Sequence, residues 1–224
     1  MSSKRVAALA ALACFCWSTA FVGIKVGLQY LPPLRFAGLR FALSGLILMP
    51  FWLARNHPPF RNIKWGLLIL LAFFQTFLLY GLLYSGMTRI PGSLTAILVG
   101  SSPLFAALTA HFLMPNDRLT LVKVVALLLG VVGVVFVTLS RRPWGQVGWS
   151  EMPGIIMVLG ACASSAIGNV IVTKVRKEFP PVFLNSCQIF LGGLGLIAVS
   201  FLFEENRSIP VAPGFYLSLA ACRT

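Results

Sequence analysis

Acidic residues are scarce in this chain, which has five Asp and Glu against 18 Lys and Arg, and charged residues make up only 10% of its 224 positions. A soluble domain of this size usually carries about a quarter charged residues. So few charges cannot cover a water-exposed surface, which excludes an ordinary soluble globular protein. The acids also avoid the apolar segments and lie between them, at Asp117, Glu151, Glu178, Glu204 and Glu205.

Metal-binding and catalytic motifs are absent as well. The five cysteines form no CxxC pair and lie in apolar segments, where they are expected to pack as small apolar residues. Neither of the two histidines is spaced with a carboxylate as an intramembrane enzyme would require. The sequence therefore predicts no metal site, no cofactor and no enzyme activity.

Apolar residues, by contrast, make up 58% of the chain and occur in blocks of about 20, the length that crosses a bilayer as a helix. The first block continues well beyond the length of a signal peptide, so it is expected to be retained as a span. The pattern predicts an all-α integral membrane protein. The expected spans are residues 6–28, 34–53, 65–87, 93–114, 121–139, 153–173 and 182–203, with an eighth span starting at 214.

The net charge of +13 comes from basic residues in the short gaps between these spans. At such positions basic residues orient a membrane protein and contact anionic lipid headgroups, so membrane lipids rather than nucleic acid are the expected partners. With the N-terminus in the cytoplasm, ten basic residues fall on the cytoplasmic side and five on the other. This bias predicts a multi-pass protein of the cell membrane, such as a bacterial inner membrane, with a cytoplasmic N-terminus.

A weak internal repeat appears when the chain is shifted by 148 residues, which places Pro32-Pro33 on Pro180-Pro181 and Gly45 on Gly193. Five spans make one unit, an odd number, so the second unit would cross the membrane in the opposite sense. Many secondary transporters have this inverted repeat and bind substrate between the two units. A seven-helix receptor would lack such a repeat. The predicted units are residues 1–140 and 153–224.

The same register matches residue 224 to residue 76, inside the third span of the first unit. About 7.5 of 10 spans would then be present. We therefore expect a fragment whose second unit is incomplete, and such a fragment would be unstable or self-associate because polar groups at membrane depth lack partners.

Polar side chains within the spans are costly in a membrane and are therefore functional candidates. Several of them share helical faces at spacings of four residues or occupy equivalent positions in the two units. The candidates for the lining of a substrate cavity are Trp17, Phe21, Lys25, Arg40, Thr76, Tyr80, Pro103, Ser165, Asn169 and Gln188.

These candidates have different alternatives. Lys25 lies about a turn from the end of its span, where it either lines the cavity or extends to the lipid headgroups. Arg40 lies deeper, which favours a cavity or ion-pair role. Asn169 fits either packing or solute binding, whereas Ser165 alone is more typical of helix packing. Pro103, in Ser101-Ser102-Pro103, predicts a break in its helix.

The charges at membrane depth are all positive, since no Asp or Glu lies within a span. A carrier of organic cations would be expected to place a carboxylate there. The sequence therefore favours an anionic, zwitterionic or neutral small-molecule solute.

Four features of the sequence occur together in this order: WSTAFVGIKVG in the first span, the following Pro32-Pro33 and Arg40, GSLTAILVGSSPLFAALTA in the fourth span, and DRLTLVKVVALLLGVVGVVFV at 117–137. This ordered set resembles the EamA-type branch of the drug/metabolite transporter superfamily. The resemblance implies ten helices in two inverted units and export or exchange of small metabolites such as amino acids. The alternatives are a truncated remnant that does not transport and, less favoured, an intramembrane enzyme.

Overall fold

The computed structural model describes residues 22–53, 65–114, 149–176 and 179–204, together with positions 7, 11, 14, 124–125, 128–130, 132–133 and 136. Within these residues every regular element is a helix. Four helices in this part of the chain are long and apolar enough to cross a membrane, and they span Trp65–Arg89, Gly92–Leu113, Met152–Val175 and Pro181–Phe203. The prediction of an all-α protein with several membrane-length apolar helices is confirmed.

Proline residues mark where three of the helices begin. Helix α2 spans Pro33–Leu53, α8 spans Met152–Val175 with a proline in its first turn, and α9 spans Pro181–Phe203. Proline is favoured at the first helical positions because its fixed φ suits a helix and its missing N–H would have no partner there. The described boundaries lie within two residues of those expected from the sequence.

The helix over Trp65–Arg89 is not uniform. It consists of α3 (Trp65–Ala72), the π-helical segment η2 (Phe73–Leu78) and α4 (Leu79–Arg89). A π-helical turn is wider than an α-helical one and is frequent at functional sites. The sequence analysis did not predict this segment, because hydropathy does not distinguish a π-helical turn from an α-helical one.

The predicted break before Pro103 is present. Helix α5 (Gly92–Gly100) ends at Ser101, and α6 (Ser102–Leu113) begins directly after it. The Ser101 hydroxyl donates a 2.6 Å hydrogen bond to the Leu98 carbonyl, which satisfies one of the last acceptors of α5. A short 3-10 turn, η4 (Trp149–Glu151), precedes α8.

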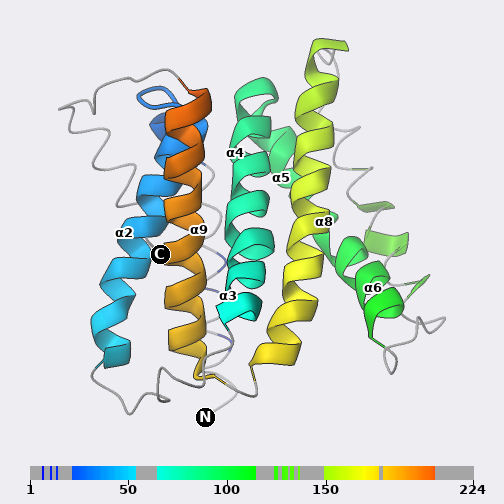
Figure 1. The fold of residues 1–224 in the computed structure, drawn as a ribbon. Coiled ribbons are helices and arrows are strands. Elements are labelled where there is room, and N and C mark those ends of the chain that lie inside the picture. Colours follow the sequence, from blue (N-terminus) through cyan, green and yellow to red (C-terminus); the bar gives the residue numbers. More distant parts are fainter. Residues whose placement is uncertain are drawn as a thin grey trace.

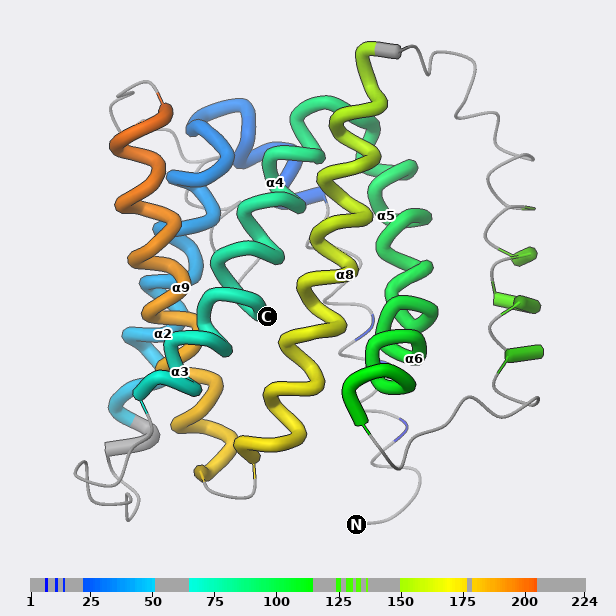
Figure 2. The backbone as a smooth tube through the Cα atoms, turned by 45° about the vertical axis from the view of Figure 1, so that its right-hand side comes forward, coloured from blue at the N-terminus to red at the C-terminus, as the bar shows by residue number. Residues whose placement is uncertain are grey.

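The described helices stand side by side (Figures 1 and 2). Helix α9 packs chiefly on α2, the α3–η2–α4 helix contacts both α9 and α8, and α6 packs on the other side of α8. The chain direction of α2 is opposite to that of α9, and that of α8 is opposite to that of α4 (Figure 1).

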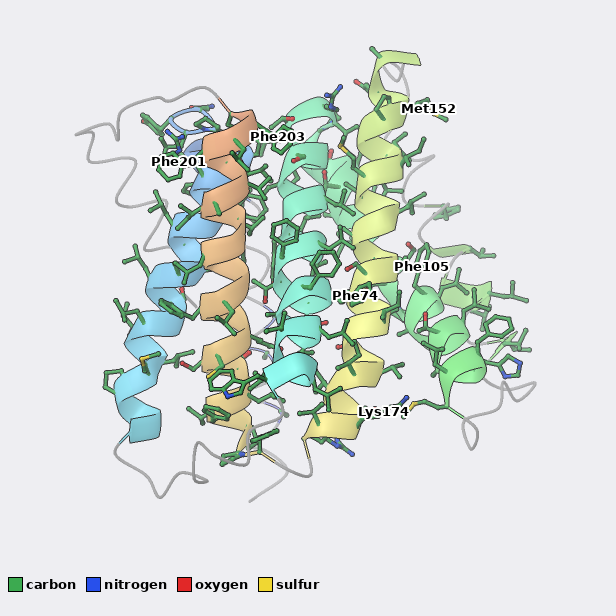
Figure 3. All side chains as sticks on the ribbon, viewed as in Figure 1. Phe74, Phe105, Met152, Lys174, Phe201 and Phe203 are labelled. Atoms are coloured by element: carbon green, nitrogen blue, oxygen red, sulfur yellow. The ribbon has the colours of Figure 1, made fainter. Side chains whose placement is uncertain are left out.

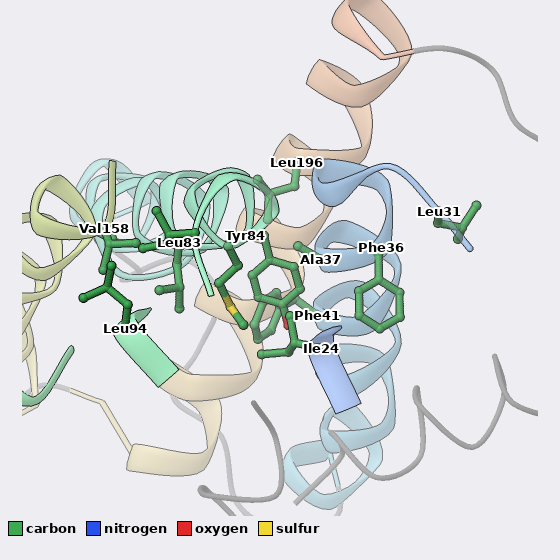
Figure 4. Close-up of a cluster of buried hydrophobic side chains, with 13 residues drawn as sticks. Ile24, Leu31, Phe36, Ala37, Phe41, Leu83, Tyr84, Leu94, Val158 and Leu196 are labelled. Carbon is green, nitrogen blue, oxygen red and sulfur yellow. The ribbon is translucent and has the colours of Figure 1, made fainter. Parts of the chain in front are cut away.

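Two clusters of buried apolar side chains hold the helices together. The larger cluster lies toward the end of the bundle where α2 begins and α4 ends, and includes Phe36, Tyr84, Met87 and Leu196 (Figure 4). The smaller one joins α3 to the junction of α8 and α9 and contains Leu68, Leu71, Val175, Phe179, Phe183 and Leu184.

Large apolar side chains also cover the outside of the bundle. Phe112, Phe201 and Phe203 are between 63% and 81% exposed, and Figure 3 shows Phe201 and Phe203 at the end of α9. No buried residue occurs in α6. Such surfaces are unfavourable in water and suit contact with lipid chains.

Candidate functional site

A polar contact between α2 and α4 joins Arg40 to Tyr84. The Arg40 guanidinium donates a hydrogen bond to the Tyr84 hydroxyl. Its Cζ also lies 5.2 Å from the centroid of the Phe41 ring, within the range of a cation–π interaction. Tyr84 is 0% exposed and packs in the larger apolar cluster (Figure 4).

An aromatic group extends from this contact along α4. The ring centroids of Tyr80 and Phe41 lie 4.0 Å apart, and those of Tyr80 and Tyr84 lie 6.3 Å apart. The structure thus brings the predicted site residues Arg40 and Tyr80 together. Phe41 also belongs to this site but was not predicted, because one more phenylalanine in an apolar span carries no distinguishing signal.

Thr76 lies on the same face as Tyr80 and packs directly on α9. A Cβ atom placed on Gly192 would lie 2.4 Å from the Thr76 Cβ, so glycine is required for this approach. Gln188 lies one turn before Gly192 on α9 and is also buried. By its helical spacing Gln188 is on the face of α9 that Thr76 contacts, although the two residues are far apart in the sequence.

Both residues keep buried oxygens without hydrogen-bond partners. Thr76 is 1% exposed and Gln188 is 8% exposed, and neither Thr76 Oγ1 nor Gln188 Oε1 has a partner among the residues that the structure describes. The Gln188 amide nitrogen donates a 2.8 Å bond to the Asn185 side-chain oxygen. A buried acceptor without a donor costs about 1–3 kcal/mol, so these oxygens are candidates for contact with a bound solute.

Asn169 binds a different side of the π-helical segment. Its side-chain oxygen accepts a 3.3 Å hydrogen bond from the Gln75 amide. One and a half turns earlier on α8, the Ser164 hydroxyl donates a 2.7 Å bond to the Phe74 carbonyl. Gln75 and Ser164 were not among the predicted site residues, although polar side chains at membrane depth are themselves a signal.

Lys25 has partners at the end of α4. Its Nζ donates to the carbonyl oxygens of Met87, at 2.6 Å, and Ile90, at 3.1 Å. The last carbonyls of a helix have no partner within it and carry the negative end of its dipole, so a lysine is favourable there. Lys25 thus binds backbone carbonyl oxygens, whereas Arg40 binds a side-chain hydroxyl.

The remaining predicted residues have less defined roles. Ser165 is half-buried on α8, and Pro103 is exposed in the first turn of α6. Trp17 and Phe21 lie outside the described residues. Within the residues that the structure describes, no group of three or more His, Cys, Asp or Glu side chains could hold a metal ion.

A family model described as the EamA-like transporter family matches residues 4–139 of this chain. The chain is 27% identical over 219 residues to "Uncharacterized transporter YvbV" of Bacillus subtilis, covering 98% of this chain and 70% of that protein. It is 28% identical over 224 residues to "Uncharacterized inner membrane transporter YedA" of Escherichia coli K12, covering 91% and 66%.

A chloroplastic WAT1-related protein of Arabidopsis thaliana is 29% identical over 200 residues, and the chain spans only 46% of its length. One solved structure, titled "Crystal structure of protein", superposes with a TM-score of 0.69 over 94% of this chain and 73% of that one. At 18% sequence identity this likeness shows the fold alone.

Proposed function

Because this chain belongs to the EamA-like transporter family, we propose that it is the membrane transporter of a small anionic, zwitterionic or neutral metabolite, such as an amino acid, and that it exports or exchanges this solute. Its family is one of transporters rather than enzymes, and the chain is a multi-pass membrane protein.

The observation that carries the charge preference is the position of Arg40. Its guanidinium lies between α2 and α4 against Tyr84 and the Phe41 ring, while no acidic residue occurs within a predicted span. A guanidinium presents a planar fork of donors that matches a carboxylate or phosphate. In surroundings of low dielectric, such a cation favours an anionic group and disfavours a second cation.

The contacts between α2 and α9 support an inverted repeat with the solute site between its units. Gly45 approaches Phe190, and Gly193 approaches Ala42. The shift of 148 residues places Gly45 on Gly193 and Ala42 on Phe190, so each of these contacts corresponds to the other. An exchange of partners between two antiparallel helices is what a two-fold axis in the membrane plane would produce. The match of the family model to residues 4–139 supports residues 1–140 as the first unit.

The orientation that we propose places the N-terminus in the cytoplasm, on the basis of the ten-to-five bias of basic residues. The end of the bundle where α2 begins and α4 ends then faces away from the cytoplasm. The relative from Escherichia coli is named an inner membrane transporter, which supports the cell membrane of a bacterium as the location.

Counterflow in proteoliposomes tests this function with the complete gene product. Labelled amino acids, dicarboxylates and organic cations are exchanged against unlabelled solute, and accumulation of one of the first two classes is the expected result. Arg40→Gln should abolish that accumulation, whereas Arg89→Gln, an exposed arginine at the end of α4, should not. Preferred exchange of organic cations would overturn the proposed charge preference.

A further inference from the structure

Two charged side chains bind helix ends that are distant from them in the sequence. Glu204, which follows α9, accepts hydrogen bonds from the backbone N–H groups of Leu34, at 2.8 Å, and Arg35, at 3.0 Å. At the same end of the bundle, Lys25 donates to the carbonyl oxygens of Met87 and Ile90. Figure 1 shows that α2 begins where α4 and α9 end.

Both contacts match the charge of a side chain to the dipole of the helix that it binds. The first turn of α2 offers N–H groups without intrahelical partners, and Pro33 has no N–H, so Leu34 and Arg35 supply the first donors. An anion is favourable at such a helix start, and a cation is favourable at the end of α4. Water can replace either side chain at a membrane surface, which makes both contacts reversible.

Buried groups hold the Glu204 carboxylate in place. The Ser200 hydroxyl donates a 2.6 Å bond to Glu204 Oε2 and accepts a 3.3 Å bond from Arg35 Nε. Arg35 is 5% exposed and Ser200 is 0% exposed. The contact is therefore part of a built network between α2 and α9 and differs from a chance contact of a surface glutamate.

The two helices that Glu204 joins also meet at glycines farther along their length. A Cβ atom on Gly38 would lie 2.8 Å from the backbone nitrogen of Ile197, and one on Gly45 would lie 2.7 Å from that of Phe190. The backbones of α2 and α9 touch at these glycines, which makes the crossing a point about which the angle between the two helices can change. Release of Glu204 at one end of this crossing would allow the two helices to separate at that end.

We propose that Glu204 and Lys25 are the clasps of a gate. In the described conformation they close the end of the bundle where α2 begins, and both release when the solute site opens to that side. Glu204 releases α9 from α2, and Lys25 releases the segment before α2 from the end of α4. The proposal rests on the proposed transport function, because a carrier must expose one site alternately to the two sides of the membrane.

Sided labelling of a single cysteine tests the gate in the complete gene product. Thr76→Cys places a thiol in the seam between η2 and α9, in a background from which the native cysteines have been removed. A membrane-impermeant maleimide is then added to vesicles of either orientation. Glu204→Gln and Lys25→Met should each raise the rate of labelling from the clasped end by about tenfold and lower the rate from the opposite side.

Two matched variants serve as controls. Glu205→Gln removes the acid that follows Glu204 in the sequence. Arg89→Met removes an exposed cation at the end of α4, the helix whose last carbonyl oxygens Lys25 binds. Neither should change the labelling rate from either side.

Unchanged labelling from the clasped end in Glu204→Gln and Lys25→Met would overturn the gate. An equal increase in the labelling rate from both sides would also overturn it, because side chains with a merely structural role would loosen the whole bundle when removed. Counterflow measured in parallel on vesicles that contain the wild-type protein separates the two proposals. Counterflow without a sided change in labelling overturns the gate alone, whereas absence of counterflow for every solute in the wild type overturns the transport function.

Discussion

Gly193 and Ala42 bring the backbones of α9 and α2 into direct contact, since a Cβ atom on Gly193 would lie 2.5 Å from the Ala42 backbone nitrogen. Gly45 makes the corresponding approach to Phe190. Lipid chains are as apolar as the side chains that they solvate, so helices in a membrane associate through close packing at small residues. This crossing is therefore a principal source of the cohesion between α2 and α9.

Gly193→Ala and Gly45→Ala should each destabilise the protein by about 1–3 kcal/mol, because the added methyl group meets backbone that cannot move aside. Thermal unfolding of the purified protein in detergent measures the effect as a lower Tm. Gly66→Ala is the control, since nothing lies within 4 Å of a Cβ atom at that position. Equal Tm values for the three variants would contradict the close contact.

Thr76→Val should raise the free energy of unfolding by about 1 kcal/mol while it lowers transport. The two side chains have nearly the same shape, and valine removes a buried hydroxyl oxygen that has no partner among the described residues. Residues kept for function often reduce stability in this way. Tm and counterflow are measured on the same preparation, and a lower Tm with full transport would show that the hydroxyl is structural.

Arg40→Lys should impair transport of a carboxylate-bearing solute nearly as much as Arg40→Gln, although it keeps the positive charge. Lysine lacks the planar fork that binds a carboxylate through two parallel hydrogen bonds and that donates to the Tyr84 hydroxyl. The loss should appear as a higher KM for the solute. Tyr84→Phe, which removes only the hydroxyl partner, should cause a smaller change. Wild-type kinetics in Arg40→Lys would indicate that only the charge matters.

Ser164→Ala should destabilise the protein by about 1 kcal/mol, because it leaves the Phe74 carbonyl in the π-helical segment without the hydroxyl that donates to it. Ser165→Ala is the matched control on the same helix, at a half-buried serine. Hydrogen exchange of the backbone amides in η2 should increase in Ser164→Ala and stay unchanged in Ser165→Ala. Equal exchange in both variants would contradict this role of Ser164.

The positions of the helices and their location in a membrane could be predicted from the residues alone. Apolar blocks of membrane length leave no other way to satisfy backbone groups in lipid, and the prolines before α2 and α9 set the starts of those helices. The Ser101-Ser102-Pro103 break also followed from local chemistry, because proline acts on its own helix. Arg40 could be identified as a candidate because a charge at membrane depth is costly wherever its partner lies.

The groups that these side chains contact depend on how the helices pack and could not be predicted from the sequence. The binding of Lys25 to the end of α4, the pairing of Gln75 with Asn169 and the approach of Thr76 to Gly192 all depend on how each helix is rotated about its axis. Hydropathy does not determine that rotation in a helix that is apolar on every side. The π-helical segment escaped prediction for the same reason. This segment contacts residues of α8 and α9 that are far away in the sequence, since Ser164 donates to the Phe74 carbonyl and Gly192 lies against Thr76.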